Sequence, residues 1–258
     1  GNNITISSGI DYPVDMNTTA FVVKLTRDCR VVNESGSVVR FYARNDTNYY
    51  GKLMMQDVEF KDIARTDSNS ATRFRIEGRW GSTHNSSGGY WEGITIHWST
   101  AVNFQEVYMY RYLHNFTVRC CAVHNAHYRG FYNVQGYNND DMAFFNNHVS
   151  RTENQGFYLS ATDGEHAEVA YNRACGNDDD GFLVNSWYLW ANGCHHNSAF
   201  MNKRRGFRLT GTGNYACHFF QNESVYAGES GIEQDTSANF IVQYNRNVDS
   251  FTPNDFIG

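Results

Sequence analysis

Short runs of alternating hydrophobic and polar residues recur along the chain and predict β-strands. The segments 157–159 (FYL), 182–184 (FLV) and 207–209 (FRL) each direct their first and third side chains to one face and the middle one to the other. The same texture continues toward the N-terminus in the stretches RFRIEG, GITIHW and NFTVRC. No segment has the 3.6-residue spacing of an amphipathic helix, so the pattern favours an all-β fold.

The strands return at a nearly constant interval, which indicates an internal repeat. A Gly-Phe step, changed once to Gly-Ile, recurs at spacings of 26, 25, 25 and 25 positions in Gly130-Phe131, Gly156-Phe157, Gly181-Phe182, Gly206-Phe207 and Gly231-Ile232. A second series has a constant spacing of 25 positions and consists of Asn147, Asn172, Asn197, Asn222 and Asn247. Two series in register with each other indicate one structural unit per interval.

A unit of this length accommodates three short strands and three turns, and it predicts a single-stranded right-handed parallel β-helix. Each coil pairs with the next through backbone hydrogen bonds, so residues one repeat apart stack at about 4.8 Å. We expect one β-helix domain over residues 1–258, with its most regular coils in 114–250 and an N-terminal cap in 1–20.

The repeated residues have expected structural roles. The ladder phenylalanines form an inward stack, and each glycine before them marks a bend with positive φ. The asparagines occupy turns, tolerate left-handed geometry and hydrogen-bond their stacked neighbours. The six cysteines form no CxxC pair and are expected to be buried free thiols. The repeat stacks Cys194 with Phe144, Val169, Phe219 and Tyr244, and it stacks Cys217 with Met142, Ala167, Asn192 and Val242.

Composition narrows the function classes. The formal charge of −6 weighs against a nucleic-acid partner, because phosphate backbones need a basic surface. No apolar run approaches about 20 residues, so no membrane span is predicted. Aromatic residues make up 16% of the chain, which is high. No signal peptide begins the sequence, and its ends suggest a mature or truncated chain.

Charged residues gather just before the ladder phenylalanines, around the run Asp178-Asp179-Asp180. The position three residues before the ladder holds Tyr128, Asn154, Asp179, Arg204 and Glu229. The position two before holds Arg129, Gln155, Asp180, Arg205 and Ser230, and the position four before holds His127, Glu153, Asp178, Lys203 and Gly228. The outward position after the ladder holds Tyr132, Tyr158, Leu183, Arg208 and Glu233. An acidic coil edge therefore lies directly beside a basic one.

Two interpretations fit these columns. In the first, acidic and basic layers neutralise each other and fix the register of the turns, each pair contributing about 0–1 kcal/mol. In the second, the columns form a polysaccharide site in which aromatic faces stack on sugar rings beside charged groups. Its substrate-binding residues would be Tyr132, Tyr158, Trp187, Tyr188, Lys203, Arg204 and Arg205.

A polysaccharide site could perform either of two reactions. In β-elimination, Asp179 and Asp180 with Glu153 would hold Ca²⁺, which prefers carboxylate oxygens, and Arg208 would abstract the proton α to a uronate carboxylate. In hydrolysis, two carboxylates act as acid and base. In the predicted stacking Asp180 and Glu153 lie about 5 Å apart, the spacing of a retaining pair, and Asp180 lies about 10 Å from Glu229 or Glu233, at or just beyond the inverting range.

The sequence from NDDDGFLVNSW through KRRGFRLTGTG to ESGIEQDTSANF resembles the catalytic coils of family-nine pectate lyases over a little under three coils. That resemblance implies Asp179 and Asp180 as Ca²⁺ ligands and Arg208 as the base, at a position where the family has lysine. Leu183 stands where the family has a further ligating aspartate. The aromatic-rich and Asn-rich texture of the whole chain is also similar to phage tailspikes, which are homotrimeric β-helices.

These observations lead to one expectation and two alternatives. We expect a polysaccharide-degrading β-helix protein, a lyase assisted by Ca²⁺, that acts on an acidic extracellular or bacterial-surface glycan. The alternatives are a tailspike glycoside hydrolase with paired carboxylates, and a non-catalytic glycan-binding or structural β-helix. The expected location is extracellular or at a virion surface, and the resemblance to tailspikes allows a homotrimer.

Overall fold

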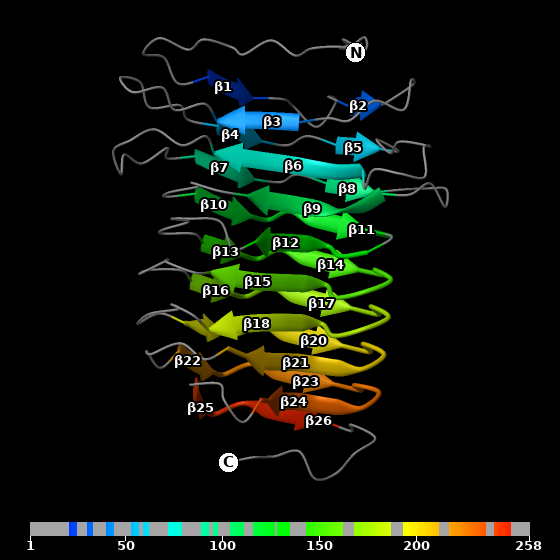
Figure 1. Cartoon of the computed structure of the whole chain (residues 1–258), viewed down its shortest axis with the longest axis vertical. Coiled ribbons are helices and arrows are strands. Elements are labelled where there is room, and N and C mark those ends of the chain that lie inside the picture. The colour runs from blue at the N-terminus through cyan, green and yellow to red at the C-terminus, as the bar shows by residue number, and fades with distance from the viewer. Residues whose placement is uncertain are drawn as a thin grey trace.

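The computed structural model describes strand segments between residues 21 and 97, and then residues 104–110, 116–126, 128–134, 143–161, 168–186, 193–211, 217–235 and 240–248. The regular structure in these residues consists of three parallel β-sheets. Figure 1 shows the strands stacked along one axis, with successive coils contributing strands to each sheet in turn. The predicted all-β fold of stacked coils is confirmed, and paired residues such as Phe182 and Phe207 lie one repeat apart.

The strands of each sheet follow one another at intervals of three along the chain. Sheet A contains β1 (Phe21–Lys24), β4 (Leu53–Gln56), β7 (Gly89–Glu92), β10 (Phe116–Arg119), β13 (Ala143–Phe145), β16 (Glu168–Ala170), β19 (Cys194–His195), β22 (Cys217–Phe220) and β25 (Phe240–Gln243). Sheet B contains β2 (Arg30–Val32), β5 (Glu59–Lys61), β8 (Thr95–His97), β11 (Ala122–His124), β14 (His148–Ser150), β17 (Arg173–Cys175), β20 (Ser198–Phe200), β23 (Glu223–Val225) and β26 (Arg246–Val248). Sheet C contains β3 (Arg40–Ala43), β6 (Thr72–Gly78), β9 (Phe104–Tyr110), β12 (Phe131–Val134), β15 (Phe157–Ala161), β18 (Phe182–Ser186), β21 (Arg205–Thr210) and β24 (Ser230–Gln234).

The phenylalanine ladder forms the predicted inward stack. Backbone pairing aligns Phe131, Phe157, Phe182, Phe207 and Ile232 in that order. The four rings are fully buried, and successive ring centroids lie 5.5, 4.7 and 4.8 Å apart. Burial of one such ring contributes about 1.5–3 kcal/mol, so the stack supplies much of the force that holds neighbouring coils together.

The asparagine ladder runs through the turns between sheets A and B. At Asn197, Nδ2 donates to Asn222 Oδ1 at 3.0 Å and to the Val169 carbonyl at 2.8 Å. Its Oδ1 accepts from the backbone nitrogen of Asn172 at 2.9 Å. These side chains are buried, and each one satisfies backbone groups that the turn leaves unpaired. The predicted hydrogen bonding between stacked asparagines is confirmed.

The predicted left-handed geometry of these asparagines is wrong, because the preceding residue carries it. Positive φ angles between 52° and 59° occur at Cys120, Asn146, Tyr171, His196, Gln221 and Tyr244. A left-handed residue turns the chain and directs the next side chain inward, where it can pair with the neighbouring coil. The asparagine is therefore selected for its amide group rather than for its backbone freedom.

A second polar ladder, which the sequence analysis missed, runs through the turns between sheets B and C. Asn177 Nδ2 donates to Asn202 Oδ1 at 2.8 Å, and Thr152 Oγ1 donates to Asn177 Oδ1 at 2.9 Å. Each member again follows a left-handed residue, in this case Arg151, Gly176 or Met201. Asn177 and Asn202 are separated by one full repeat in the sequence, and this spacing could have revealed the ladder.

The last coil is shorter than predicted, by two positions. Asn222 bonds to Asn245, so Asn245 rather than Asn247 continues the ladder. For the same reason Val242, not Tyr244, continues the column of Cys194 and Phe219, and Phe240, not Val242, pairs with Cys217. The links from Phe144 through Val169 and Cys194 to Phe219 are confirmed. Met142, Ala167 and Asn192 lie outside the described residues.

The predicted positive φ at the ladder glycines is also wrong. Positive φ among the described glycines occurs at Gly176, Gly193 and Gly211 and not at the glycines that precede the phenylalanines. The reason for glycine is close approach instead. A Cβ built on Gly181 would lie 2.7 Å from the Gly206 carbonyl oxygen and 2.6 Å from Asn202 Nδ2. Any side chain at this position would push neighbouring coils apart.

The described cysteines are free thiols, as predicted, but their burial differs. Cys121, Cys194 and Cys217 are buried, Cys175 is half-buried and Cys120 is exposed. Burial raises the pKa of the Cys194 and Cys217 thiols, so both remain protonated and act as small apolar groups in the core.

Two glycine substitutions distinguish the loss of stability caused by a steric clash from the loss caused by a strained positive φ. Gly181→Ala should lower the free energy of unfolding by more than about 2 kcal/mol, because its Cβ meets backbone and a ladder amide. Gly176→Ala has open space around the new Cβ and a φ of +62°, so it should cost about 1–2 kcal/mol. Urea denaturation of both variants measures the difference. Equal destabilisation would contradict the close-approach explanation.

Removal of one ladder amide should be more costly than removal of an exposed one. Asn197→Ala leaves several buried groups unpaired, including the Val169 carbonyl, at about 1–3 kcal/mol for each group. We expect a loss of at least about 3 kcal/mol in the free energy of unfolding, measured by urea denaturation. Gln243→Ala, at an exposed position of β25, is the matched control and should change stability by less than about 0.5 kcal/mol.

Candidate functional site

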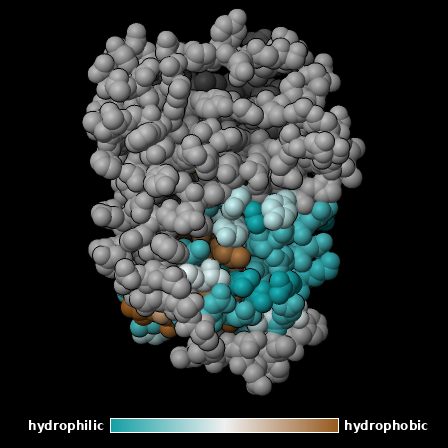
Figure 2. Space-filling view, viewed as in Figure 1, coloured by the Kyte–Doolittle hydropathy of each residue, from teal (hydrophilic) through white to brown (hydrophobic). Residues whose placement is uncertain are grey.

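The predicted charge columns lie in the turns that lead from sheet B into sheet C. In these turns Lys203, Arg204 and Arg205 follow β20 on the coil next to the run 178–180, which follows β17. Figure 2 shows hydrophilic side chains gathered on the side of the molecule where Figure 1 places these turns. The sequence therefore brings the charged residues together as predicted, and the contacts between them define what they can do.

One chain of polar contacts runs along the coils through Asp179. The Arg204 guanidinium donates from Nη1 to Asp179 Oδ1 at 3.2 Å and from Nε to the two Glu229 carboxylate oxygens at 3.0 and 3.1 Å. The other oxygen of Asp179 accepts from Gln155 Nε2. These contacts connect successive coils, because each one joins side chains about one repeat apart in the sequence. Lys203 and Asp178 form a further pair at 3.1 Å, which is exposed on both sides.

A second chain of contacts lies deeper and is centred on Arg205. This guanidinium donates from Nη1 to Asp180 Oδ1 at 3.3 Å and from Nε to Glu233 Oε2 at 2.6 Å. Asp180 is fully buried and Arg205 is 8% exposed. The second oxygen of Asp180 has no hydrogen-bond partner among the described residues. Such a buried pair fixes the register of two coils, whereas the exposed Lys203–Asp178 pair contributes little.

The electrostatics of Asp180 follow from its position. Burial, together with the neighbouring Asp179 carboxylate, raises the pKa of Asp180 to about 6, and Arg205 offsets part of this effect. Asp180 is thus the titrating group of the buried network. Its side chain has no exposed surface, so in this arrangement it contacts Arg205 and not a surface ligand.

Aromatic residues and an arginine form a compact cluster at the neighbouring coils of sheet C. The guanidinium carbon of Arg129 lies 4.1, 4.2 and 4.6 Å from the ring centroids of Tyr128, Tyr132 and Tyr158. The rings of Tyr132 and Tyr158 meet edge to face at 4.9 Å. Arg129 Nε also donates to Gln155 Oε1 at 2.9 Å. The cation and the two sheet tyrosines are half-buried, so the cluster is both ordered and accessible.

Backbone register places residues of all the other strands of sheet C in the same column as Tyr132 and Tyr158. Backbone register aligns Arg40, Arg75, Tyr108, Tyr132, Tyr158, Leu183, Arg208 and Glu233. Leu183 is 7% exposed, and Arg208 lies beyond it with Nη2 3.7 Å from Asp235 Oδ2. Sequence reasoning found the column from Tyr132 onward. It missed the members at 40, 75 and 108 because the intervals there are longer or shorter than the regular repeat.

The structure describes most of the predicted site residues, among them Arg208, which lies beside Asp235. Asp179, Asp180, Lys203, Arg204, Arg205 and Glu233 are brought together in the ion-pair chains, and Tyr132 and Tyr158 lie in the aromatic cluster beside them. Glu153 is exposed at the turn position that Asp178 occupies one coil later. Trp187 and Tyr188 lie outside the described residues.

The two predicted calcium ligands, Asp179 and Asp180, already accept hydrogen bonds from neighbouring side chains. Asp179 accepts from Gln155 and Arg204, and Asp180 accepts from Arg205, so guanidinium and amide groups occupy carboxylate oxygens that Ca²⁺ would use. Across the described ranges, no group of three or more His, Cys, Asp or Glu side chains is placed to hold a metal ion. This arrangement favours ion pairing at these carboxylates, and calcium binding stays a prediction.

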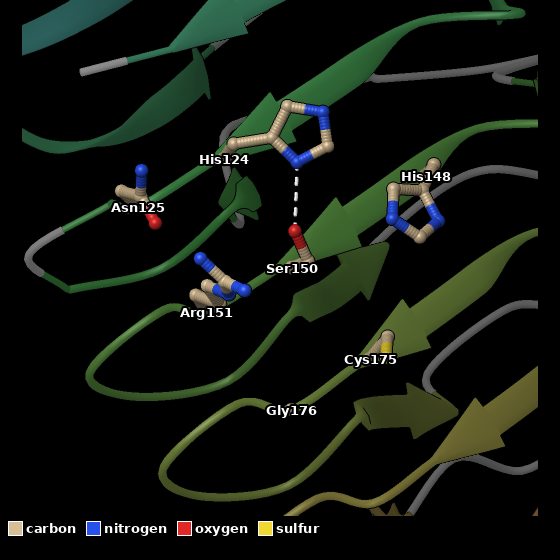
Figure 3. A pocket seen from close by; sticks show the side chains of 7 residues that line it. All are labelled: His124, Asn125, His148, Ser150, Arg151, Cys175 and Gly176. Atoms are coloured by element: carbon tan, nitrogen blue, oxygen red, sulfur yellow. Dashed lines mark hydrogen bonds between the residues drawn. The ribbon is translucent and has the colours of Figure 1, made fainter. Parts of the chain in front are cut away.

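A pocket that sequence reasoning missed lies where β11, β14 and β17 of sheet B end. It has a volume of about 580 Å³ and is lined by His124, Asn125, His148, Ser150, Arg151, Cys175 and Gly176 (Figure 3). Different residue types stack in its columns, so no repeat marks it in the sequence. The lining contains donor groups from successive coils.

No family model matches the chain, and no curated protein or solved structure matches it either. Within the part of the chain that the structure describes, no helix is long and apolar enough to span a membrane. The findings support a parallel β-helix protein, and the likeness to pectate lyases and tailspikes stays a prediction.

The raised pKa of Asp180 predicts a pH-dependent stability with a definite sign. Because its folded pKa of about 6 exceeds the ordinary value of 3.8, the folded chain holds this proton more tightly than the unfolded chain. The contribution of Asp180 to the free energy of unfolding is therefore largest below pH 4 and falls as the pH rises to about 6. The full change is on the order of 3 kcal/mol.

Urea denaturation of the unsubstituted protein and of Asp180→Asn between pH 4 and 8 tests this sign. The unsubstituted protein should lose stability relative to the variant as the pH rises to about 6, and the difference should then level off. Asp178→Asn removes an exposed carboxylate whose ion pair contributes about 0–1 kcal/mol, and it is the matched control. A stability difference for Asp180→Asn that stays constant from pH 4 to 8 would contradict the assignment.

Proposed function

We propose that the protein binds an extended acidic polysaccharide along the outer face of sheet C. The observation that carries this proposal is the register of Tyr108, Tyr132 and Tyr158, which follow one another on three adjacent strands. Flat aromatic side chains at regular intervals suit a polymer of apolar-faced rings such as sugars. The non-catalytic alternative from the sequence is thus the one with most geometric support.

Arginines in and beside the same column support an acidic polymer. Arg129 lies over the tyrosine rings, and Arg75 and Arg208 occupy register positions on either side of the tyrosines. A guanidinium beside an aromatic face can pair with a carboxylate while the ring contacts the sugar. The three aspartates of the charge columns do not oppose this, because their carboxylates pair with Lys203, Arg204 and Arg205.

Cleavage of the bound polysaccharide would require more of the protein than binding does. In β-elimination, Arg208 would act as the base with Ca²⁺ near Asp179. In hydrolysis, Glu153 and Glu233 are the predicted carboxylates with exposed or half-exposed side chains. Asp180 would support either reaction from the interior by holding Arg205. An acidic polysaccharide ligand would place the working protein outside a cell or at a virion surface, where a homotrimer is also proposed.

Assays with a panel of uronate-containing and neutral polysaccharides distinguish binding alone from β-elimination and from hydrolysis. Retarded migration in affinity electrophoresis with acidic but not neutral polymers is the expected result. A rise in ultraviolet absorbance from unsaturated ends, abolished by a chelator, would identify calcium-assisted elimination. New reducing ends without that absorbance would identify hydrolysis. Absence of retardation across the whole panel would overturn the proposal.

Removal of one ring should weaken polysaccharide binding in proportion to its contact. Tyr158→Ala removes about 0.5–1.5 kcal/mol of aromatic contact, which corresponds to a loss of about 2- to 10-fold in affinity. Tyr226 is an exposed tyrosine at a left-handed turn position outside this column, so Tyr226→Asn is the matched control and should leave affinity unchanged. Affinity electrophoresis with the best acidic polymer measures both. Equal losses for the two variants would speak against sheet C as the binding face.

A further inference from the structure

The pocket on sheet B differs in place and chemistry from the tyrosine column on sheet C. Its lining consists of residues of β11, β14 and β17 and of the left-handed residues Asn125, Arg151 and Gly176 that follow these strands. Backbone register aligns His124 with Ser150 and Ser150 with Cys175, so these residues occupy one column on three adjacent coils. The volume of about 580 Å³ lies within the range of small-molecule sites.

Hydrogen-bonding groups converge in this pocket. His124 Nδ1 and Ser150 Oγ are 2.7 Å apart, and the rings of His124 and His148 have their centroids 5.4 Å apart. Figure 3 shows the His124 ring over Ser150, with the His148 ring and the Arg151 side chain on either side. Imidazole, hydroxyl and guanidinium groups together offer N–H and O–H donors to one ligand.

The charge of the pocket sets it apart from the rest of a chain with a net charge of −6. Its seven lining residues include no carboxylate. Lys203, Arg204, Arg205, Arg208 and Arg246 all have ion-pair partners. Arg151, by contrast, is exposed, and no ion pair joins it to another described residue. Arg173 is the β-sheet register partner of His148 and adds a second positive charge beside the pocket. Its guanidinium carbon lies 5.8 Å from the centroid of the Phe200 ring.

From this concentration of donors and positive charge we propose that the pocket binds an oxyanion, a carboxylate or sulfate group, carried on a ligand the size of one sugar residue. Arg151 supplies the permanent charge, and Ser150 and the two imidazoles supply shorter-range hydrogen bonds. The pocket volume exceeds what a free inorganic anion fills, and the remainder accommodates a sugar ring. This site stands independently of polymer binding on sheet C.

The imidazoles make anion binding sensitive to pH. Burial and the charge of Arg173 lower the pKa of His148, so this ring is neutral near pH 7 when the pocket is empty. The groups that face it from the neighbouring strands are His124 on β11 and Arg173 on β17, and His97 on β8 shares the register of His124. A bound anion favours the protonated imidazole, so binding takes up a proton and strengthens as the pH falls.

Calorimetric titration with glucuronate and glucose tests the proposal, because the two sugars differ mainly in one carboxylate. We expect glucuronate to bind, glucose to give no detectable heat, and inorganic sulfate to compete with glucuronate. The affinity for glucuronate should rise about threefold or more from pH 7.5 to pH 5.5. Equal binding of glucose and glucuronate would overturn the oxyanion assignment.

Arg151→Gln should weaken glucuronate binding by about tenfold or more, since it removes a charged hydrogen bond. Arg246→Gln removes the same charge from β26, where Arg246 pairs with Glu223 at 3.0 Å, and it is the matched control that should leave affinity unchanged. Tyr158→Ala should also leave it unchanged, which separates this pocket from the sheet C surface. Equal losses in the two arginine variants would overturn the pocket as the binding site.

Alkylation of cysteines locates the ligand without any substitution. Cys175 lines the pocket and Cys120 is exposed outside its lining, so both thiols can be followed by mass spectrometry in one sample. Glucuronate should slow the alkylation of Cys175 and leave that of Cys120 unchanged. Unchanged alkylation of Cys175 at a glucuronate concentration that saturates the calorimetric signal would place the ligand elsewhere and refute the proposal.

Discussion

Stacking of each coil on its neighbour at one β-strand separation is the constraint on which the rest of the molecule depends. Every side chain in the regular coils meets its own equivalent from the next repeat, so a column persists only if its residues tolerate that contact. Phenylalanine does so through stacked rings whose centroids lie 4.7 to 5.5 Å apart, and asparagine does so because one amide is both donor and acceptor. Glycine is required where backbones approach too closely for any Cβ.

Charged residues meet the same constraint by alternating in sign. Three aspartates on one coil would repel three on the next, but Lys203, Arg204 and Arg205 follow them, and Glu229 and Glu233 follow those. This alternation offsets the repulsion within the run of three aspartates. Its buried part, from Asp180 to Arg205, couples the register of two coils to the protonation of one carboxylate.

The repeat made the fold predictable because self-stacking leaves its period in the sequence. The columns around Phe182 and Asp180 were placed correctly from that period alone. The prediction failed at the last coil, where the register slips by two positions. A slip of two preserves the alternation of inward and outward side chains, so hydrophobic pattern cannot detect it. Local matching of QNESV with YNRNV, which aligns Asn222 with Asn245, would have detected it.

The reasons assigned to individual residues were harder to predict than their positions. Glycine before phenylalanine has two possible explanations, positive φ and close approach, and only coordinates separate them. The pocket on sheet B had no signal at all, since His124, Ser150 and Cys175 share a column without sharing a residue type. Repeats identify what a β-helix needs to stack, and binding chemistry lies where the repeat is broken.

The same reasoning bears on where a ligand can bind. Columns that satisfy themselves, such as the asparagine ladders, have few hydrogen-bonding groups left for a partner. The tyrosines around Arg129 and the donors around Arg151 are different, because neither set repeats through the regular coils. In this β-helix, some columns therefore hold the coils together and other columns are left to bind ligands. The tyrosine rings of sheet C and the positive charge at the ends of strands β11, β14 and β17 in sheet B belong to the second kind.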